Sequence, residues 1–327
     1  MPLNKETLNV SESRCPHGYE SHNVEVVNTG YALFITSIVI NCLTCFPATV
    51  ANALVIIAVT STPSLHTPSH MLLCNLAITD LAVGLFVQPT YIVSRIAEVK
   101  NYFNTFCDTW LASRLLASWK TNASLLTLTA ISIDRVLAMH LGVRYRLVVS
   151  TKRVKLYLVF LWISAGLLSA TRLKFENVQV FLGISSAIYM ICLAVLVGSY
   201  WKTFRALRSH QLEVCDYFQR ERSLSVNAMH YKRSLYTMLY IVGLVLLCYL
   251  PYISLALPVV ITGRSVAERA AWNIVDTLLF LNSSLNPMLY YWRIKEIRCL
   301  VLEIVHRMCP LCFTNQLSFQ KAVQNNP

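Results

Sequence analysis

Residues 31–60 read YALFITSIVINCLTCFPATVANALVIIAVT, a run that contains no charged side chain. A helix that crosses the hydrocarbon core of a bilayer needs roughly 20 predominantly apolar residues. A stretch with this length and composition therefore predicts a membrane-spanning helix.

Six further stretches of the chain have the same character. They are residues 71–94, 108–139, 156–171, 177–201, 234–263 and 270–292. The stretch 108–139 is the least apolar, so we expect it to face the interior of a bundle rather than lipid. Together the seven stretches predict an all-α integral membrane protein, a bundle of seven transmembrane helices. Residues 293–308 then combine apolar residues at helical spacing with basic residues on other faces, which predicts an amphipathic helix on the membrane surface.

The composition excludes an ordinary soluble protein. Hydrophobic residues make up 55% of the 327 residues and charged residues only 13%, whereas soluble domains carry about 25% charged residues. The net charge of +12 would suit a nucleic-acid partner in a soluble protein. Here the basic residues cluster in connections beside apolar stretches, as membrane insertion requires, so we expect no nucleic-acid partner.

The distribution of basic residues also predicts the orientation. The connections after the third and fifth stretches hold twice as many Lys and Arg residues as those after the second, fourth and sixth. The positive-inside rule then predicts an extracellular N-terminus and a cytoplasmic C-terminus. Asn9, in the sequon Asn9-Val10-Ser11, falls on the glycosylated side. The expected domains are an extracellular tail (1–30), a transmembrane domain (31–292), a membrane-surface helix (293–308) and a cytoplasmic tail (309–327).

Six short motifs lie in order within these stretches and carry a resemblance to a known family. They are Ala51-Asn52-Ala53-Leu54-Val55, Leu76-Ala77-Ile78-Thr79-Asp80, Ser132-Ile133-Asp134-Arg135-Val136, Trp162, Cys248-Tyr249-Leu250-Pro251 and Asn286-Pro287-Met288-Leu289-Tyr290. In this order they resemble the rhodopsin-like (class A) G-protein-coupled receptors, over about residues 31–312. The resemblance implies a plasma-membrane receptor, not an enzyme, whose partners are an extracellular ligand, a heterotrimeric G protein, arrestin and membrane lipid.

Two other readings stay open. An atypical receptor that binds ligand without coupling to a G protein is one, because two of the motifs depart from the family pattern. A transporter is the other, although the chain shows no internal repeat of the kind on which many transporters are built.

The resemblance also implies roles for particular residues. A sodium ion would be held by oxygen-bearing residues, as a hard cation requires: Asp80, Ser124, Asn282, Ser283 and Asn286. The switch toward the G protein would consist of Asp134, Arg135, Tyr200 and Tyr290. The activation hinge would consist of Tyr249, Pro251, Asn286 and Pro287, since proline removes a backbone hydrogen bond from a membrane helix.

Several positions depart from the family pattern. Tyr249 replaces the usual tryptophan beneath the ligand pocket, and Tyr231 replaces the acidic residue that holds Arg135 in many relatives, so we expect some basal activity. The second extracellular loop contains no cysteine, so the family's usual disulfide cannot form. We expect Cys15 to pair with Cys107 instead. Two cysteines that follow the surface helix, Cys309 and Cys312, are candidates for palmitoylation, with unmodified thiols as the alternative.

The ligand is the least defined part of this prediction. The short second extracellular loop looks like that of the melanocortin, cannabinoid, lysophospholipid and adenosine branch. Ala117 argues against an amine, Phe280 against an opsin and Ala256 against adenosine. The charged residues left at the outer end are Arg95, Arg114, Arg172 and Asp276. They suggest an anionic ligand or lipid headgroup, unless they serve to pair with one another.

Overall fold

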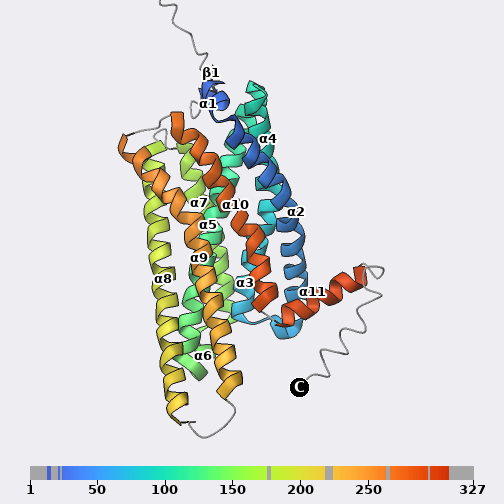
Figure 1. Cartoon of the computed structure of the whole chain (residues 1–327), viewed down its shortest axis with the longest axis vertical. Coiled ribbons are helices and arrows are strands. Elements are labelled where there is room, and N and C mark those ends of the chain that lie inside the picture. Colours follow the sequence, from blue (N-terminus) through green and yellow to red (C-terminus); the bar gives the residue numbers. More distant parts are fainter. Residues whose placement is uncertain are drawn as a thin grey trace, which may run out of the picture.

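The computed structural model describes residues 13–15, 21–22, 24–174, 178–217, 224–262, 266–293 and 295–308. Within these ranges long helices run side by side in one bundle (Figure 1). The rods are α2 (Tyr31–Ser61), α3 with η2 and α4 (Pro68–Val99), α5 (Phe103–Leu141), α7 (Thr151–Lys174), α8 (Val178–Tyr217), α9 (Leu224–Thr262) and α10 (Val266–Arg293). The predicted all-α bundle of seven helices is confirmed.

Short elements lie at the two ends of the bundle. The N-terminal part holds the two-residue strands β1 (Ser13–Arg14) and β2 (Ser21–His22), which pair antiparallel, and the helix α1 (Val24–Thr29). The opposite end holds η1 (Pro63–Leu65), η3 (Gly142–Arg144), α6 (Tyr145–Val148) and α11 (Lys295–Met308). In Figure 1, α11 points away from the bundle at the end opposite to α1, where the amphipathic helix was expected.

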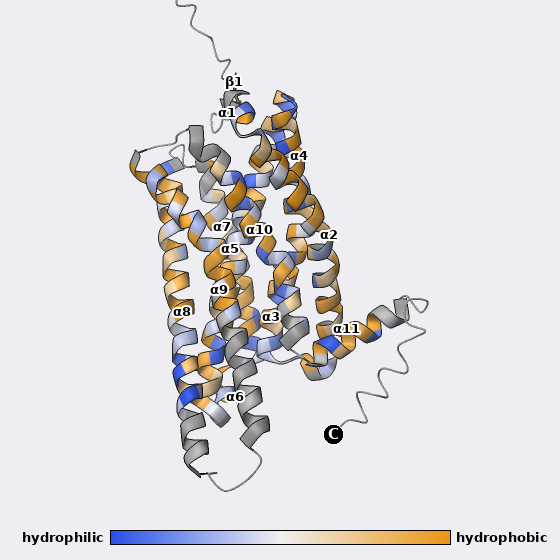
Figure 2. Cartoon of the chain, viewed as in Figure 1, coloured by the Kyte–Doolittle hydropathy of each residue, from blue (hydrophilic) through white to orange (hydrophobic). Residues whose placement is uncertain are grey.

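The outer surface of the bundle is apolar. Large side chains such as Phe46, Phe160 and Ile261 are 73%, 67% and 79% exposed, and Figure 2 shows hydrophobic residues along most of the length of the rods. Such extensive apolar exposure suits a hydrocarbon environment and not water. Among the described residues, six of the rods are long and apolar enough to cross a membrane.

The helix that does not belong to these six is α10, because it contains many polar side chains. It buries a row of polar side chains against the other helices, which are Asn273, Asp276, Thr277, Asn282, Ser283, Ser284 and Asn286. Two of the contacts join α10 to α2, because Asn52 Nδ2 donates to the carbonyl oxygen of Ser283 over 3.0 Å and Asn41 Nδ2 to Thr277 Oγ1 over 3.0 Å. The seventh span is therefore polar on the side that faces its neighbours.

The second rod contains a break. The α-helix α3 (Pro68–Ala82) passes into the π-helical turn η2 (Val83–Val87) and then into α4 (Gln88–Val99), which has Pro89 in its first turn. A proline cannot donate to the preceding turn, and a π turn accommodates the missing hydrogen bond by inserting a residue. The inserted residue changes the direction in which every side chain of α4 points.

A set of polar contacts fixes the fourth rod against the second and third. Trp162 Nε1 on α7 donates to Asn75 Oδ1 on α3 over 2.8 Å, and Asn75 Nδ2 donates to Thr127 Oγ1 on α5 over 2.9 Å. Trp162 also packs edge-on against Trp119, with ring centroids 5.5 Å apart. These contacts hold α5 in place, and α5 carries five of the residues to which the sequence assigns a role, Cys107, Arg114, Ser124, Asp134 and Arg135.

Candidate functional site

One end of the bundle is closed by a disulfide. Cys15 is bonded to Cys107 near the start of α5, as expected from the sequence. The bond lies in a small hydrophobic cluster with Ala97, Phe106 and Trp110. It therefore ties the N-terminal segment to the third span beside the outer end of α4.

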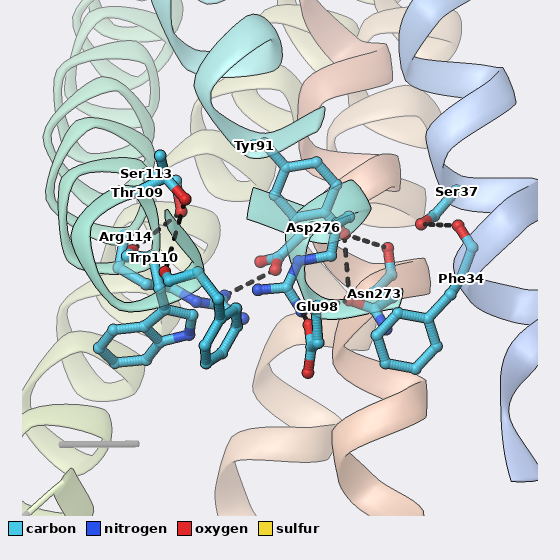
Figure 3. A network of polar contacts seen from close by, with 12 residues as sticks. Phe34, Ser37, Tyr91, Glu98, Thr109, Trp110, Ser113, Arg114, Asn273 and Asp276 are labelled. Carbon is cyan, nitrogen blue, oxygen red and sulfur yellow. Dashed lines mark hydrogen bonds and ion pairs between the residues drawn. The ribbon is translucent and has the colours of Figure 1, made fainter. Parts of the chain in front are cut away.

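Two ion pairs lie at this same end. On α4, Arg95 Nη1 lies 2.6 Å from Glu98 Oε2, and both side chains are buried. Between helices, Arg114 Nη1 on α5 donates to Asp276 Oδ2 on α10 over 2.6 Å, with 19% of the Arg114 side chain exposed. Figure 3 shows Glu98, Arg114 and Asp276 close together between α4, α5 and α10.

The pairing changes the charge balance expected for the ligand-binding set. Arg95 and Arg114 each have a carboxylate partner, and the side chain of Arg172 lies outside the described residues. The sequence interpretation omitted Glu98, although its spacing of three residues from Arg95 on one helix was a usable signal. Arg114 and Asp276 therefore pair with each other in this structure. Ligand binding by the four charged residues of the predicted set stays a prediction.

Asn273 on α10 joins the buried pair to the seventh span. Its Oδ1 accepts from Arg95 Nη1 and from the Tyr91 hydroxyl, each over 3.2 Å. The Arg95 guanidinium also lies over the Tyr91 ring, 5.3 Å from its centroid. Any movement of α10 relative to α4 at this end must therefore disturb buried polar contacts.

An aromatic cluster lies below this end, around the position where the family has its tryptophan. Tyr249 on α9 is buried and packs edge-on against Tyr189 on α8, with centroids 6.0 Å apart. Tyr189 also contacts Tyr252 at 5.1 Å, and Tyr252 contacts Trp272 on α10 at 5.4 Å. The hydroxyl of Tyr189 donates to Asn122 Oδ1 on α5 over 2.9 Å. The cluster thus connects α10, α9, α8 and α5.

The hinge prolines are placed as the motifs require. Pro251 lies inside α9 two residues beyond Tyr249, and Pro287 lies inside α10. Both interrupt the backbone hydrogen bonds of a continuous helix. One of the two prolines inside α9 therefore lies immediately beside the aromatic cluster. A hinge movement at these prolines stays a prediction.

A cluster of buried polar side chains, called the polar cluster, is formed by residues of α3, α5 and α10. All five residues of the expected sodium set are buried there: Asp80, Ser124, Asn282, Ser283 and Asn286. Asn286 Nδ2 on α10 donates to Asp80 Oδ2 on α3 over 2.7 Å. The structure thus brings together Asp80 and Asn286 of the expected set, and sodium binding stays a prediction.

A buried lysine lies near the polar cluster, and the sequence did not predict it as part of the sodium site. Lys120 on α5 is 5% exposed, and its Nζ donates to the carbonyl oxygen of Leu279 on α10 over 3.0 Å. A charged side chain at the centre of a membrane helix costs about 2.5–3.5 kcal/mol on insertion scales, so a partner is needed. The sequence predicted that the stretch 108–139 faces the bundle interior, but it did not predict which groups Lys120 would contact.

The opposite end of the bundle carries two of the residues predicted to form the switch, Asp134 and Arg135. Arg135 Nη2 lies 3.3 Å from Asp134 Oδ2, at the end of α5. Asp134 also accepts hydrogen bonds from Ser69 Oγ over 2.7 Å and from the hydroxyl of Tyr145 on α6. Burial and the hydrogen bond to Asp134 raise the pKa of the Tyr145 phenol, which keeps it protonated as a donor. Neither Ser69 nor Tyr145 was included in the sequence-based set.

The other predicted switch, glycosylation and lipidation residues lie partly outside the described residues. Tyr200 is buried on α8. The side chains of Tyr231 and Tyr290 lie outside the described residues, as do Asn9, Cys309 and Cys312. Their roles in the switch, glycosylation and lipidation stay predictions.

Comparison with known proteins assigns the chain to a family. A family model described as 7 transmembrane receptor (rhodopsin family) matches residues 51–185 and 172–290, which is more than half of the chain. The chain belongs to this family, whose members are receptors rather than enzymes. It is accordingly a multi-pass protein of the plasma membrane.

Individual relatives cover most of the chain. It is 26% identical over 308 residues to the adenosine receptor A3 of Ovis aries, which spans 85% of this chain and 92% of the relative. It is 27% identical over 305 residues to the adenosine receptor A2b of Bos taurus, with 81% and 88% covered. It is 22% identical over 275 residues to the histamine H2 receptor of Rattus norvegicus, with 78% and 75% covered.

Proposed function

We propose that this chain is a ligand-activated receptor that transmits an extracellular signal to heterotrimeric G proteins. The observation that carries the proposal is the Asp134–Arg135 pair at 3.3 Å, held by Ser69 and Tyr145 at the end of α5. The side chain of Arg135, which is 32% exposed, is restrained there by the buried carboxylate of Asp134. The bundle end opposite the disulfide would be cytoplasmic, which agrees with the excess of basic residues in its connections.

The proposed mechanism is a shift between two arrangements of the bundle. A ligand bound among the outer ends of α4, α5, α9 and α10 would disturb the aromatic cluster around Tyr249. The end of α9 on the Arg135 side would then swing outward around Pro251 and open a groove. A helix of the G protein can insert into such a groove. A near-complete shift requires about 5.5 kcal/mol of differential ligand affinity between the two states.

For the ligand contact we propose the Arg114–Asp276 pair. Arg114 is 19% exposed, whereas Arg95 is only 2% exposed and already bonded to Glu98. A ligand with an anionic group can compete with Asp276 for Arg114 at a smaller desolvation cost than it can reach Arg95. The named ligands of the adenosine and histamine receptors are not carried over, because Ala256 and Ala117 replace the residues expected to contact them. Contacts with arrestin and with specific lipids stay predictions.

Guanine-nucleotide exchange tests the proposal directly. Purified receptor in lipid nanodiscs should accelerate nucleotide uptake by at least one class of G protein above the rate with empty discs. Arg135→Ala should return the rate to that of empty discs, because the arginine would form the floor of the groove. The control Arg298→Ala changes an arginine on α11, away from the groove, and should keep most of the rate. A folded receptor that is silent with every class would instead indicate an atypical receptor without coupling.

Asp134→Asn is expected to raise the ligand-free exchange rate several-fold. The substitution keeps the shape of the side chain but removes the negative charge that restrains Arg135, so the active arrangement is populated more often. Asp108→Asn, an acid of α5 near its other end, is the matched control and should leave the rate unchanged. An unchanged or lower rate in Asp134→Asn would show that this pair does not hold the resting state.

A further inference from the structure

Lys120 is a buried cation that the switch and the ligand pocket leave unexplained. It precedes Arg135 by 15 residues on α5, which corresponds to about 22 Å at 1.5 Å per residue. A position at that distance from the end of the span lies within the hydrocarbon core, which is about 30 Å thick. A cation at this depth requires partners inside the bundle.

The structure provides two partners from different helices. Nζ donates to the carbonyl oxygen of Leu279 on α10 over 3.0 Å, and the ammonium interacts electrostatically with Asp80 on α3. Within the described part of the chain the two charges form no ion pair shorter than 4.0 Å. Their attraction therefore acts over more than 4.0 Å, and together with the hydrogen bond to Leu279 it connects α3, α5 and α10.

Two buried oxygen atoms are acceptors that suit the remaining protons of this ammonium. Asp80 Oδ1 and Asn282 Oδ1 are buried without a hydrogen bond of ordinary geometry. Buried polar atoms in proteins are normally satisfied, so these atoms indicate a further donor. A lysine has three N–H donors, and only one of them is used on Leu279.

We propose that the Lys120 ammonium takes the place of a sodium ion at Asp80, so that the receptor binds no sodium there. The charges of Asp80 and Lys120 sum to zero. A sodium ion would add an uncompensated positive charge beside an ammonium in a buried region, where like charges repel strongly. Lysine also has no acceptor atom, so it cannot serve as a ligand to the metal. The expected oxygen set is present, but it does not fit a sodium ion while Lys120 is charged.

The covalent attachment of this ammonium to α5 has a regulatory consequence, which rests on the proposed receptor function. A bound ion can dissociate, and its occupancy follows the salt concentration. An ammonium attached to α5 cannot dissociate into solvent, and its contacts with Leu279 and Asp80 change when α3, α5 and α10 move relative to one another. The resting arrangement would therefore be stabilised by a built-in cation that does not respond to external sodium.

A sodium titration of the purified receptor tests this inference without any signalling readout. The thermal unfolding midpoint is measured at constant ionic strength while sodium replaces potassium. The wild-type midpoint should stay constant from sodium-free buffer to several hundred millimolar sodium. Lys120→Asn replaces the cation by an oxygen ligand, so its midpoint should be lower without sodium and rise by several degrees when sodium is added. The double variant Lys120→Asn/Asp80→Asn lacks the carboxylate and should show no sodium response.

Two results would overturn the proposal. The first is a wild-type midpoint that rises with sodium but not potassium and loses this response in Asp80→Asn, because sodium would then bind beside Lys120. The second is a folded Lys120→Asn receptor whose midpoint ignores sodium. If Lys120→Asn does not fold, direct binding of radioactive sodium to the wild type decides the question. A failure to activate any G protein would leave all of these measurements unaffected.

Discussion

Glu98→Ala is expected to destabilise the fold by about 3–5 kcal/mol, the cost typical of breaking a buried ion pair from one side. Glu98 is fully buried and Arg95 is 2% exposed, with 2.6 Å between their charged atoms. Without the carboxylate the guanidinium stays buried, and its Nε and Nη2 have no hydrogen-bond partner in the described structure. The thermal midpoint of the purified receptor and the fraction that reaches the cell surface both measure the loss.

A set of variants distinguishes the effect of losing the ion pair from the effect of losing side-chain packing. The double variant Arg95→Met/Glu98→Leu should recover most of the stability, since replacing both charges by apolar groups is often neutral. Asp276→Asn, at the more exposed Arg114 pair, should cost less than Glu98→Ala because water reaches Arg114. A double variant no more stable than Glu98→Ala would show that the shape of these side chains, and not their charge, maintains this end of the bundle.

Gly84→Ala is expected to cost about 1–3 kcal/mol or more, the range for overpacking a well-packed interior. Gly84 lies in the π turn η2, where the second span lies against α2. A Cβ at this position would lie 2.8 Å from Thr49 N and 2.9 Å from the carbonyl oxygen of Cys45, and closer still to Thr49 Oγ1. Two of these atoms belong to the backbone of a helix, so the helices themselves must separate. The hydrogen bond from Cys45 Sγ to the Gly84 carbonyl oxygen, 3.0 Å long, would be lost as well.

Gly198→Ala is the matched control for this effect. Gly198 lies inside α8, and a Cβ added there meets no atom within 4 Å. Alanine is the better helix former, so the midpoint of this variant should stay the same or rise slightly. Equal midpoints for Gly84→Ala and Gly198→Ala would mean that α2 and the second span can separate without loss of stability.

Much of the fold and of the switch could be predicted from residue types alone. The seven rods, the helix after them and the Cys15–Cys107 bond all agree with the structure. The Asp134–Arg135 pair could be anticipated because both residues are neighbours in a motif. The partners Ser69 and Tyr145 could not, since they come from other helices and no motif marks them.

The sequence by itself determined that this chain forms apolar rods, and in what order, because solubility in hydrocarbon depends on the composition of about 20 consecutive residues. Only the tertiary structure decided which buried charges meet. The direction of a side chain depends on the accumulated rotation of its helix, and the π turn at Val83–Val87 changes that rotation partway along the second rod. The contacts of Arg114 with Asp276 and of Lys120 with Leu279 join different helices, so no spacing in the sequence specifies them.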